Sequence, residues 1–355
     1  MGLIRTTPPR PVDVTAVFPE LALLARPAMR LHPRPGSPSV RDSSVGGPLL
    51  WPAREPWPHC EDAHLHVDTG FRQSPTEVRL QRRLQSRWRP DDRPPVFTPE
   101  EEALKERNAA WLAARFDAGP PRPAECPVPM LPVAQLFLRD IPLLQPPGQA
   151  DLLQILWCPY EHEPDAKPST ALFWRTAAEV GDILATPPEP YEADYPGYVP
   201  EPCVLAPETI TEYPNSLDLS PELQLALDDW DRWQAAGIDS YYAEYPREFY
   251  STHLGNAPGW KVGGWPPWGR TDPYPRYCAV CEAQMVPLLT IASWEWDGDQ
   301  GPSWAPLEDQ AAAAASHYAG QDPAQPTGVE VGSTDNMQMY VCPTSPKHPH
   351  TDLIQ

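Results

Sequence analysis

Two stretches of this chain repeat one arrangement, in which an apolar strand runs into a Cys-Pro pair and a histidine follows. The first stretch is Leu152–His162 and the second is Met337–His348. Nearly continuous apolar runs of this kind are typical of buried strands. Proline has no amide donor, so it ends a strand or confines it to an edge. The sequence therefore predicts two buried strands, each with a thiol at its end and an imidazole close behind.

The repetition extends beyond these strands. The Val-Gly-Gly-Pro segment at 45–48 corresponds to Val-Gly-Gly-Trp-Pro at 262–266, and Pro129–Leu136 corresponds to Gln284–Ile291. Three matched elements in the same order favour an internal duplication. The alternative is that such short apolar and glycine-rich elements recur by chance in a proline-rich chain.

Proline content restricts the fold further. The chain has 52 prolines among 355 residues, about three times the usual share of roughly 5%. Long helices and central strands must therefore lie between proline-rich connections. The 14 tryptophans and 13 tyrosines supply aromatic area that disordered segments lack. We expect a sheet-rich α+β fold, internally duplicated, with two mostly antiparallel sheets and a few peripheral helices.

Composition shifts divide the chain into four parts. They are a proline-rich N-terminal lead (1–44), a first half (45–175) with inserted helices over 72–116, a proline-rich connection (176–249) with a helix over 220–236, and a second half (250–355). The clearest helix start is the capping box of Thr98 and Glu101 with Pro99 between them. An alanine run at 311–315 predicts one more helix.

An arginine-rich stretch at 72–93 stands out in this acidic chain. Its arginines are Arg72, Arg79, Arg82, Arg83, Arg87 and Arg89. We expect a short helix in a surface insertion, whose arginines pair with the protein's own carboxylates at about 0–1 kcal/mol each. The alternative is a docking site for an acidic partner.

Charge and cysteine content limit the partners and the compartment. The net charge of −21 repels nucleic-acid backbones and anionic membranes, whereas another protein, particularly a basic one, fits this field. No targeting signal or spanning segment is recognisable, which favours the cytoplasm. The seven cysteines are odd in number, and in such a compartment they favour metal binding or free thiols over disulfides.

Each half offers four sulfur and nitrogen donors as two local pairs. The first half has Cys60 and His64 with Cys158 and His162; the second has Cys278 and Cys281 with Cys342 and His348. Four such donors form the closed tetrahedral set that structural zinc prefers. His350 is a possible substitute for His348. The alternative is that Cys158 and Cys342 are simply buried thiols, which we expect of Cys126 and Cys203.

A second histidine pattern favours a different reading. Asp62-Ala-His-Leu-His-Val-Asp68 contains His-x-His, which in several metal-dependent hydrolases supplies an active-site metal. The surrounding chain shows no alternation of strands and helices that would support a barrel. Catalysis would also require an open coordination position.

Together, the Gly-Gly-Pro opening, the Leu-Pro-Val-Ala-Gln-Leu element and the Leu-Trp-Cys-Pro strand resemble the YwqG-like domain family in its actinobacterial form. The resemblance covers most of 45–355, with 70–125 as a less familiar insertion. The Cys-x-x-Cys…Cys-Pro layout is distantly similar to programmed cell death protein two, whose relatives are dedicated chaperones of a ribosomal protein. The resemblance implies a duplicated α+β fold without known catalytic residues. Thr290 stands where a glutamine is usual.

Three function classes follow. The first is a non-catalytic, protein-binding or chaperone-like module, with Trp57, Trp265 and Trp268 as candidate partner-binding residues. The alternatives are an immunity or accessory protein of a toxin system and a metal-dependent hydrolase. Packing in the core is the competing expectation for at least half of the tryptophans near the Gly-Gly openings.

Overall fold

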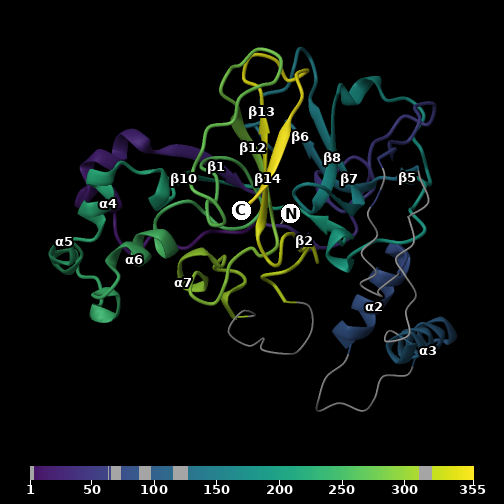
Figure 1. Cartoon of the computed structure of the whole chain (residues 1–355), viewed down its shortest axis with the longest axis horizontal. Coiled ribbons are helices and arrows are strands. Elements are labelled where there is room, and N and C mark those ends of the chain that lie inside the picture. Colours follow the sequence, from purple (N-terminus) through teal and green to yellow (C-terminus); the bar gives the residue numbers. More distant parts are fainter. Residues whose placement is uncertain (1–3, 63, 65–72, 88–96, 115–126, 312–321) are drawn as a thin grey trace.

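The computed structural model describes residues 4–62, 64, 73–87, 97–114, 127–311 and 322–355. Its strands form two antiparallel six-stranded sheets and one separate pair of short strands (Figure 1). Sheet A contains, in spatial order, β10 (Glu208–Glu212), β1 (Arg26–Arg30), β11 (Lys261–Gly263), β12 (Val286–Ala292), β13 (Asn336–Val341) and β14 (Thr351–Ile354). Sheet B contains β2 (Arg34–Pro35), β9 (Cys203–Val204), β3 (Ser44–Val45), β6 (Leu131–Phe137), β7 (Leu152–His162) and β8 (Lys167–Arg175). The predicted sheet-rich α+β fold is confirmed.

The two sheets have the same internal order. Strands β3, β6, β7 and β8 follow one another in sheet B, as β11, β12, β13 and β14 do in sheet A. The two strands that carry the Cys-Pro pattern, β7 and β13, occupy the same position, each with a neighbour on both sides. This correspondence agrees with an internal duplication.

Strand register matches as well. Gln135 pairs with Gln154 in sheet B, and Thr290 pairs with Gln338 in sheet A. Each pairing has an irregularity just before this point, between Pro132 and Ala134 in one sheet and between Pro287 and Leu289 in the other. A bulge shared at one register position is a specific feature of a strand pair.

The substitution of Thr290 for glutamine changes how the neighbouring chain is held. Gln135 is buried; its carboxamide accepts the Leu50 amide at 2.7 Å and donates to the carbonyls of Val40 and Asp42 at 3.0 Å. Thr290 instead donates to Gln338 Oε1 at 2.7 Å. Gln135 therefore holds the segment that leads into sheet B. The hydrogen bond of Thr290 joins two strands of sheet A and does not hold a neighbouring segment in this way.

The expected lead and connection both contribute strands. Segment 26–35 supplies β1 to sheet A and β2 to sheet B, and segment 203–212 supplies β9 to sheet B and β10 to sheet A. The two segments run antiparallel, with β1 pairing β10 and β2 pairing β9. They are thus integral to both sheets rather than a lead and a surface connection. These strands are too short to show a clear hydrophobic periodicity. The strands that they pair with lie far away in the sequence, so the pairing gives no local signal either.

Both sheets contribute to one hydrophobic core. Leu289 and Met337 of sheet A belong to the same group of buried side chains as Leu153 and Trp157 of sheet B. A second group of buried side chains contains Phe18, Trp233 and Tyr250 and lies among the N-terminal turn and the helices at one side of the molecule. The halves of the repeat therefore pack together rather than folding as independent units.

Most helices lie at the two sides of the strands (Figure 1). They are α1 (Val14–Val17), α2 (Pro75–Arg87), α3 (Pro99–Ala114), α4 (Pro221–Leu227), α5 (Trp230–Ala235), α6 (Pro246–His253) and α7 (Gly301–Trp304). The capping box of α3 forms as predicted, with Thr98 and Glu101 exchanging hydrogen bonds. Among the described residues, none of the helices combines the length and apolarity needed to cross a bilayer.

Two helix predictions need comment. The helix expected over 220–236 is divided in two between Asp228, the C-terminal cap residue of α4, and Asp229, which precedes α5 without a side-chain capping bond. Short polar residues are weak helix formers and favour such ends. Of the helix expected at the alanine run, residues 310 and 311 are helical, and the rest of the run lies outside the described residues.

Helix α2 is more firmly attached than a surface insertion. The predicted ion pairs form, between Arg79 and Glu189 at 2.7 Å and between Arg82 and Glu201 at 3.1 Å. However, Arg82 also donates to three backbone carbonyls, and Val78 is buried in the main core. Arg72 and Arg89 lie outside the described residues. The charge pattern of this stretch gives no sign of the Val78 contact, because a single apolar side chain anchors this face of the helix.

We expect Val78→Asp to lower the free energy of unfolding by about 3 kcal/mol or more, because it buries a carboxylate without a partner. The matched control is Gln85→Asp, which adds the same charge at an exposed position of the same helix. Urea unfolding of both variants measures the difference. Equal and small losses would show that α2 is a surface insertion after all.

Candidate metal centres

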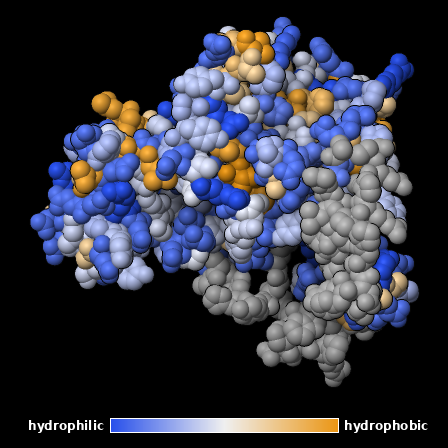
Figure 2. Space-filling view, in the orientation of Figure 1, coloured by the Kyte–Doolittle hydropathy of each residue, from blue (hydrophilic) through white to orange (hydrophobic). Residues whose placement is uncertain are grey.

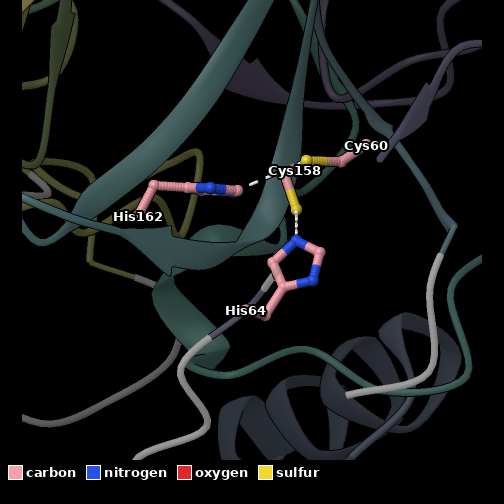
Figure 3. Close-up of side chains that lie close together, drawn as sticks. All are labelled: Cys60, His64, Cys158 and His162. Atoms are coloured by element: carbon pink, nitrogen blue, oxygen red, sulfur yellow. Dashed lines mark hydrogen bonds between the residues drawn. The ribbon is translucent and has the colours of Figure 1, made fainter. Parts of the chain in front are cut away.

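The first centre is formed where three segments meet at one end of sheet B. Cys60 lies in β4 (His59–Cys60), which pairs with β5 (Val128–Pro129). His64 follows β4, whereas Cys158 and His162 belong to β7. Cys60, His64 and Cys158 are buried and His162 is half-buried. All four side chains point toward a common space (Figure 3).

The donor atoms of the first centre lie close together. Cys60 Sγ is 3.7 Å from His162 Nε2, and His64 Nε2 is 3.1 Å from Cys158 Sγ. All four donor atoms lie within 4.8 Å of one another. The other ring nitrogen of His162, Nδ1, is 3.9 Å from a carboxylate oxygen of Asp62. This distance is too long for a hydrogen bond, but the carboxylate lies on the side of the ring from which acidic groups commonly orient a metal-binding histidine.

The second centre lies at the corresponding end of sheet A. Cys278 Sγ is 3.4 Å from His348 Nδ1, and Cys281 Sγ is 3.5 Å from Cys342 Sγ. These four donor atoms also lie within 4.8 Å of one another. The sulfur–sulfur distance far exceeds the roughly 2.05 Å of a disulfide, and the three cysteines of this centre, Cys278, Cys281 and Cys342, are free.

The two centres correspond residue by residue. Met130 donates to the Pro58 carbonyl as Met285 donates to that of Arg276, so Cys60 and Cys278 take equivalent places two residues further on. Cys158 and Cys342 lie at corresponding places, although β13 stops just before Cys342 whereas β7 continues through Cys158 and Pro159 to His162, so the strand end predicted at the first Cys-Pro pair is wrong. His162 and His348 each approach the first cysteine. The remaining pair is His64 and Cys281. The first set is therefore Cys₂His₂ and the second Cys₃His.

The geometry fits a tetrahedral metal. With Zn–S bonds near 2.3 Å and Zn–N bonds of 2.0–2.1 Å, neighbouring ligand atoms are about 3.3–3.8 Å apart. The four contacts between donor atoms, from 3.1 to 3.7 Å, are close to this range. The eight residues thus lie in the two groups of four predicted from the sequence, and each group could hold a metal ion.

Local interactions favour the thiolate form that binds metals at Cys60 and Cys342 but not at Cys281. The Ala283 amide lowers the pKa of Cys281, but the contact with Cys342 and burial outweigh it and raise that pKa. A hydrogen bond from Cys158 lowers the pKa of Cys60 to about 3, and His162 adds to this shift although burial opposes it. Burial raises the pKa of Cys342, but the Ser345 amide and His348 outweigh it, and the resulting pKa is about 6.

Other candidate residues have different roles. His350 hydrogen-bonds Thr170 of β8 at 2.8 Å and so links the last strands of the two sheets. Cys203 is buried and donates to the Pro326 carbonyl at 3.2 Å, as expected of a structural thiol. Cys126 and the second half of the His-x-His-x-Asp pattern, His66 and Asp68, lie outside the described residues.

The three candidate tryptophans are placed differently. Trp57 is only 7% exposed; it packs against Trp51 and donates to the Met130 carbonyl at 2.9 Å. The structure thus assigns it to the core, so it does not offer a free surface, because its ring fills the space beside β4 and β5. Trp265 and Trp268 line one groove near the second centre.

Sequence reasoning missed the neighbours of these groups. Asp62 belongs to the His-x-His pattern, and its spacing gives no sign that its carboxylate lies near His162. Asp218, Arg276 and Tyr340, which share the groove with Trp265 and Trp268, carry no spacing signal, because they come from three distant segments.

No protein-family model matches the chain, and the curated proteins contain no significantly similar sequence.

Proposed function

We propose that this protein is a non-catalytic, protein-binding module of the YwqG-like kind, in which one structural zinc ion secures each half of the duplicated sheet fold. The observation that carries the proposal is the placement of two four-donor groups at corresponding ends of the two sheets. Such a repetition is expected of a structural device that was duplicated with the fold. A catalytic centre needs only one copy.

Ligand chemistry supports zinc in both groups. Sulfur and imidazole donors in sets of four are typical of closed structural zinc sites. The six cysteines of the described chain are free, which agrees with a reducing compartment such as the cytoplasm. In the first group the metal would join Cys60 to Cys158, about a hundred residues further along the chain, and in the second it would join Cys278 to Cys342, about sixty residues further. Each metal ion would therefore close a long loop.

The closed ligand set argues against the hydrolase alternative. A catalytic zinc keeps an open position for water or substrate, whereas each group here supplies four protein donors. The acidic charge and the largely hydrophilic face in Figure 2, with apolar side chains in a few small groups, support a role in binding other proteins.

Elemental analysis of the purified chain tests the metal proposal. We expect two zinc ions per chain, and about one in the double variant Cys60→Ser/Cys158→Ser. Chelation should release both ions and lower the unfolding temperature by many degrees, because metal binding contributes to folding directly. A stable protein without metal would overturn the proposal.

A further inference from the structure

A groove of about 630 Å³ lies beside the second metal centre. Its walls contain four prolines and five aromatic side chains, Trp265, Trp268, Tyr274, Tyr277 and Tyr340. Tyr274 and Tyr277 are 43% and 58% exposed, so their rings are open to a ligand. The rings of Trp268 and Tyr274 are 5.9 Å apart between centroids. These two rings therefore pack against each other, and the groove offers the open faces of Tyr274 and Tyr277 to a ligand.

A buried polar atom in this groove, the Tyr340 hydroxyl, makes no hydrogen bond within the described chain. Tyr340 and Trp268 are 4% and 8% exposed. Burial raises the pKa of Asp218 to about 6, and the Trp268 indole opposes this shift, so the indole and the carboxylate serve each other. Buried polar groups are rarely left unpaired, so the remaining Tyr340 hydroxyl indicates a ligand with an acceptor.

The acidic chain as a whole favours a basic partner, but the two arginines of the groove, Arg26 and Arg276, locally favour a carboxylate on the ligand. Arg26 stacks on Trp265 at 3.4 Å and interacts with Asp218. Arg276 donates through Nε to Thr351 and through Nη1 to Tyr274, and it forms no ion pair with a described residue. Its guanidinium is therefore available to an acidic group. A cationic ligand is disfavoured, because Arg26 already covers the face of Trp265.

We propose that this groove binds an acidic, proline-rich segment of a partner protein in the polyproline II conformation. This inference rests on the proposed protein-binding function and names the class of partner. Proline rings pack against open aromatic faces such as those of Tyr274 and Tyr277, and polyproline II leaves its carbonyls free to accept from a hydroxyl. Tyr340 would supply this donor, and Arg276 would pair with the acidic residue.

The metal centre supports the walls of the groove. Arg276 and Tyr277 directly precede Cys278, and Tyr340 is two residues before Cys342. Met285 and Tyr340 pack with both cysteines in one buried group. Occupation of the second centre would therefore hold both walls in place before a ligand arrives, which reduces the entropy lost on binding.

Calorimetric titration of the intact protein with a twelve-residue peptide of four Pro-Pro-Glu repeats tests the proposal. We expect binding in the micromolar range, with weaker binding of a Pro-Pro-Lys peptide and none of an Ala-Ala-Glu peptide, which keeps the charge but not the conformation. Tyr340→Phe removes only the hydroxyl and should weaken binding about 3–10-fold, the effect of one hydrogen bond. Arg276→Gln should weaken it similarly and reduce its salt dependence.

The matched control is Tyr241→Phe, at an exposed tyrosine outside the groove, which should leave affinity unchanged. Failure of all three peptides to bind at millimolar concentration, or equal affinity of the Ala-Ala-Glu peptide, would overturn the proposal. So would a dimer in sedimentation that Tyr340→Phe dissociates, since the occupant would then be a second copy of this chain. Two zinc ions in a protein that binds no peptide would leave the structural-zinc proposal intact and reject the groove alone.

Discussion

Replacing Cys342 by serine is expected to lower the free energy of unfolding by several kcal/mol and to reduce the zinc content from two ions to one per chain. Cys342 is buried at the end of β13, 3.5 Å from Cys281. Loss of one thiolate opens a closed set, and structural zinc contributes ~10 kcal/mol or more in small finger peptides. Elemental analysis and urea unfolding measure the two effects.

Cys203→Ser is the matched control for this prediction. Cys203 is equally buried, but its thiol donates to the Pro326 carbonyl, and a serine hydroxyl can keep that bond. We expect a loss of about 1 kcal/mol. Similar losses in both variants, with unchanged zinc content, would mean that Cys342 is only a buried thiol. His348→Ala distinguishes the ligand role of His348 from that of His350, which is already bonded to Thr170.

The second large effect is expected at a buried ion pair in sheet A. Lys261 Nζ lies 2.7 Å from Glu212 Oε1, and both side chains are fully buried. Glu212 also accepts the amides of Ala257 and Trp265 at 2.8 and 2.9 Å. Burial lowers the pKa of Lys261, and Glu212 opposes this shift. Glu212→Leu should therefore destabilise the fold by about 3–5 kcal/mol, because it leaves a buried charge unpaired.

A double-mutant cycle separates the pair from its surroundings. We expect the loss in Glu212→Leu/Lys261→Met to be smaller than the sum of the single losses, because the unpaired ammonium is removed as well. Glu189→Leu, which breaks the exposed pair with Arg79, should cost no more than about 1 kcal/mol. A loss below 1 kcal/mol in Glu212→Leu would show that Lys261 reaches water when its partner is removed.

The pair also links segment 203–212, which contains β10, to β11 of the duplicated strands. Glu212 ends β10 and Lys261 begins β11, and β1 lies between these strands. Arg30 of β1 is fully buried as well and donates to the Trp304 carbonyl at 2.8 Å. Charged side chains thus replace apolar ones on this face of sheet A. Such groups make the strand order specific, since any other register would leave them unpaired.

Much of the site could be predicted because its signals are local. Cys60 and His64, Cys158 and His162, and Cys278 and Cys281 are each separated by two or three residues, and a Cys-Pro pair follows the apolar run of both β7 and β13. Repetition then related the two groups to one another. The approach of the Asp62 carboxylate to His162 and the burial of Trp57 could not be predicted in this way. Both depend on where β5 and the end of β7 lie in the fold.

The sequence alone determined the sheet-rich fold, the correspondence of β7 with β13 and the two groups of donors, because apolar period, proline and ligand spacing act within a few residues. Only the tertiary structure decided that Arg26–Pro35 and Cys203–Glu212 complete both sheets, that Val78 anchors α2 in the core, and that Trp265, Arg276 and Tyr340 share a groove. These features arise from contacts between segments far apart in the chain. Such contacts are stabilised by the burial of apolar side chains, by backbone hydrogen bonds between strands and by ion pairs. None of these interactions requires a particular spacing of the residues in the sequence.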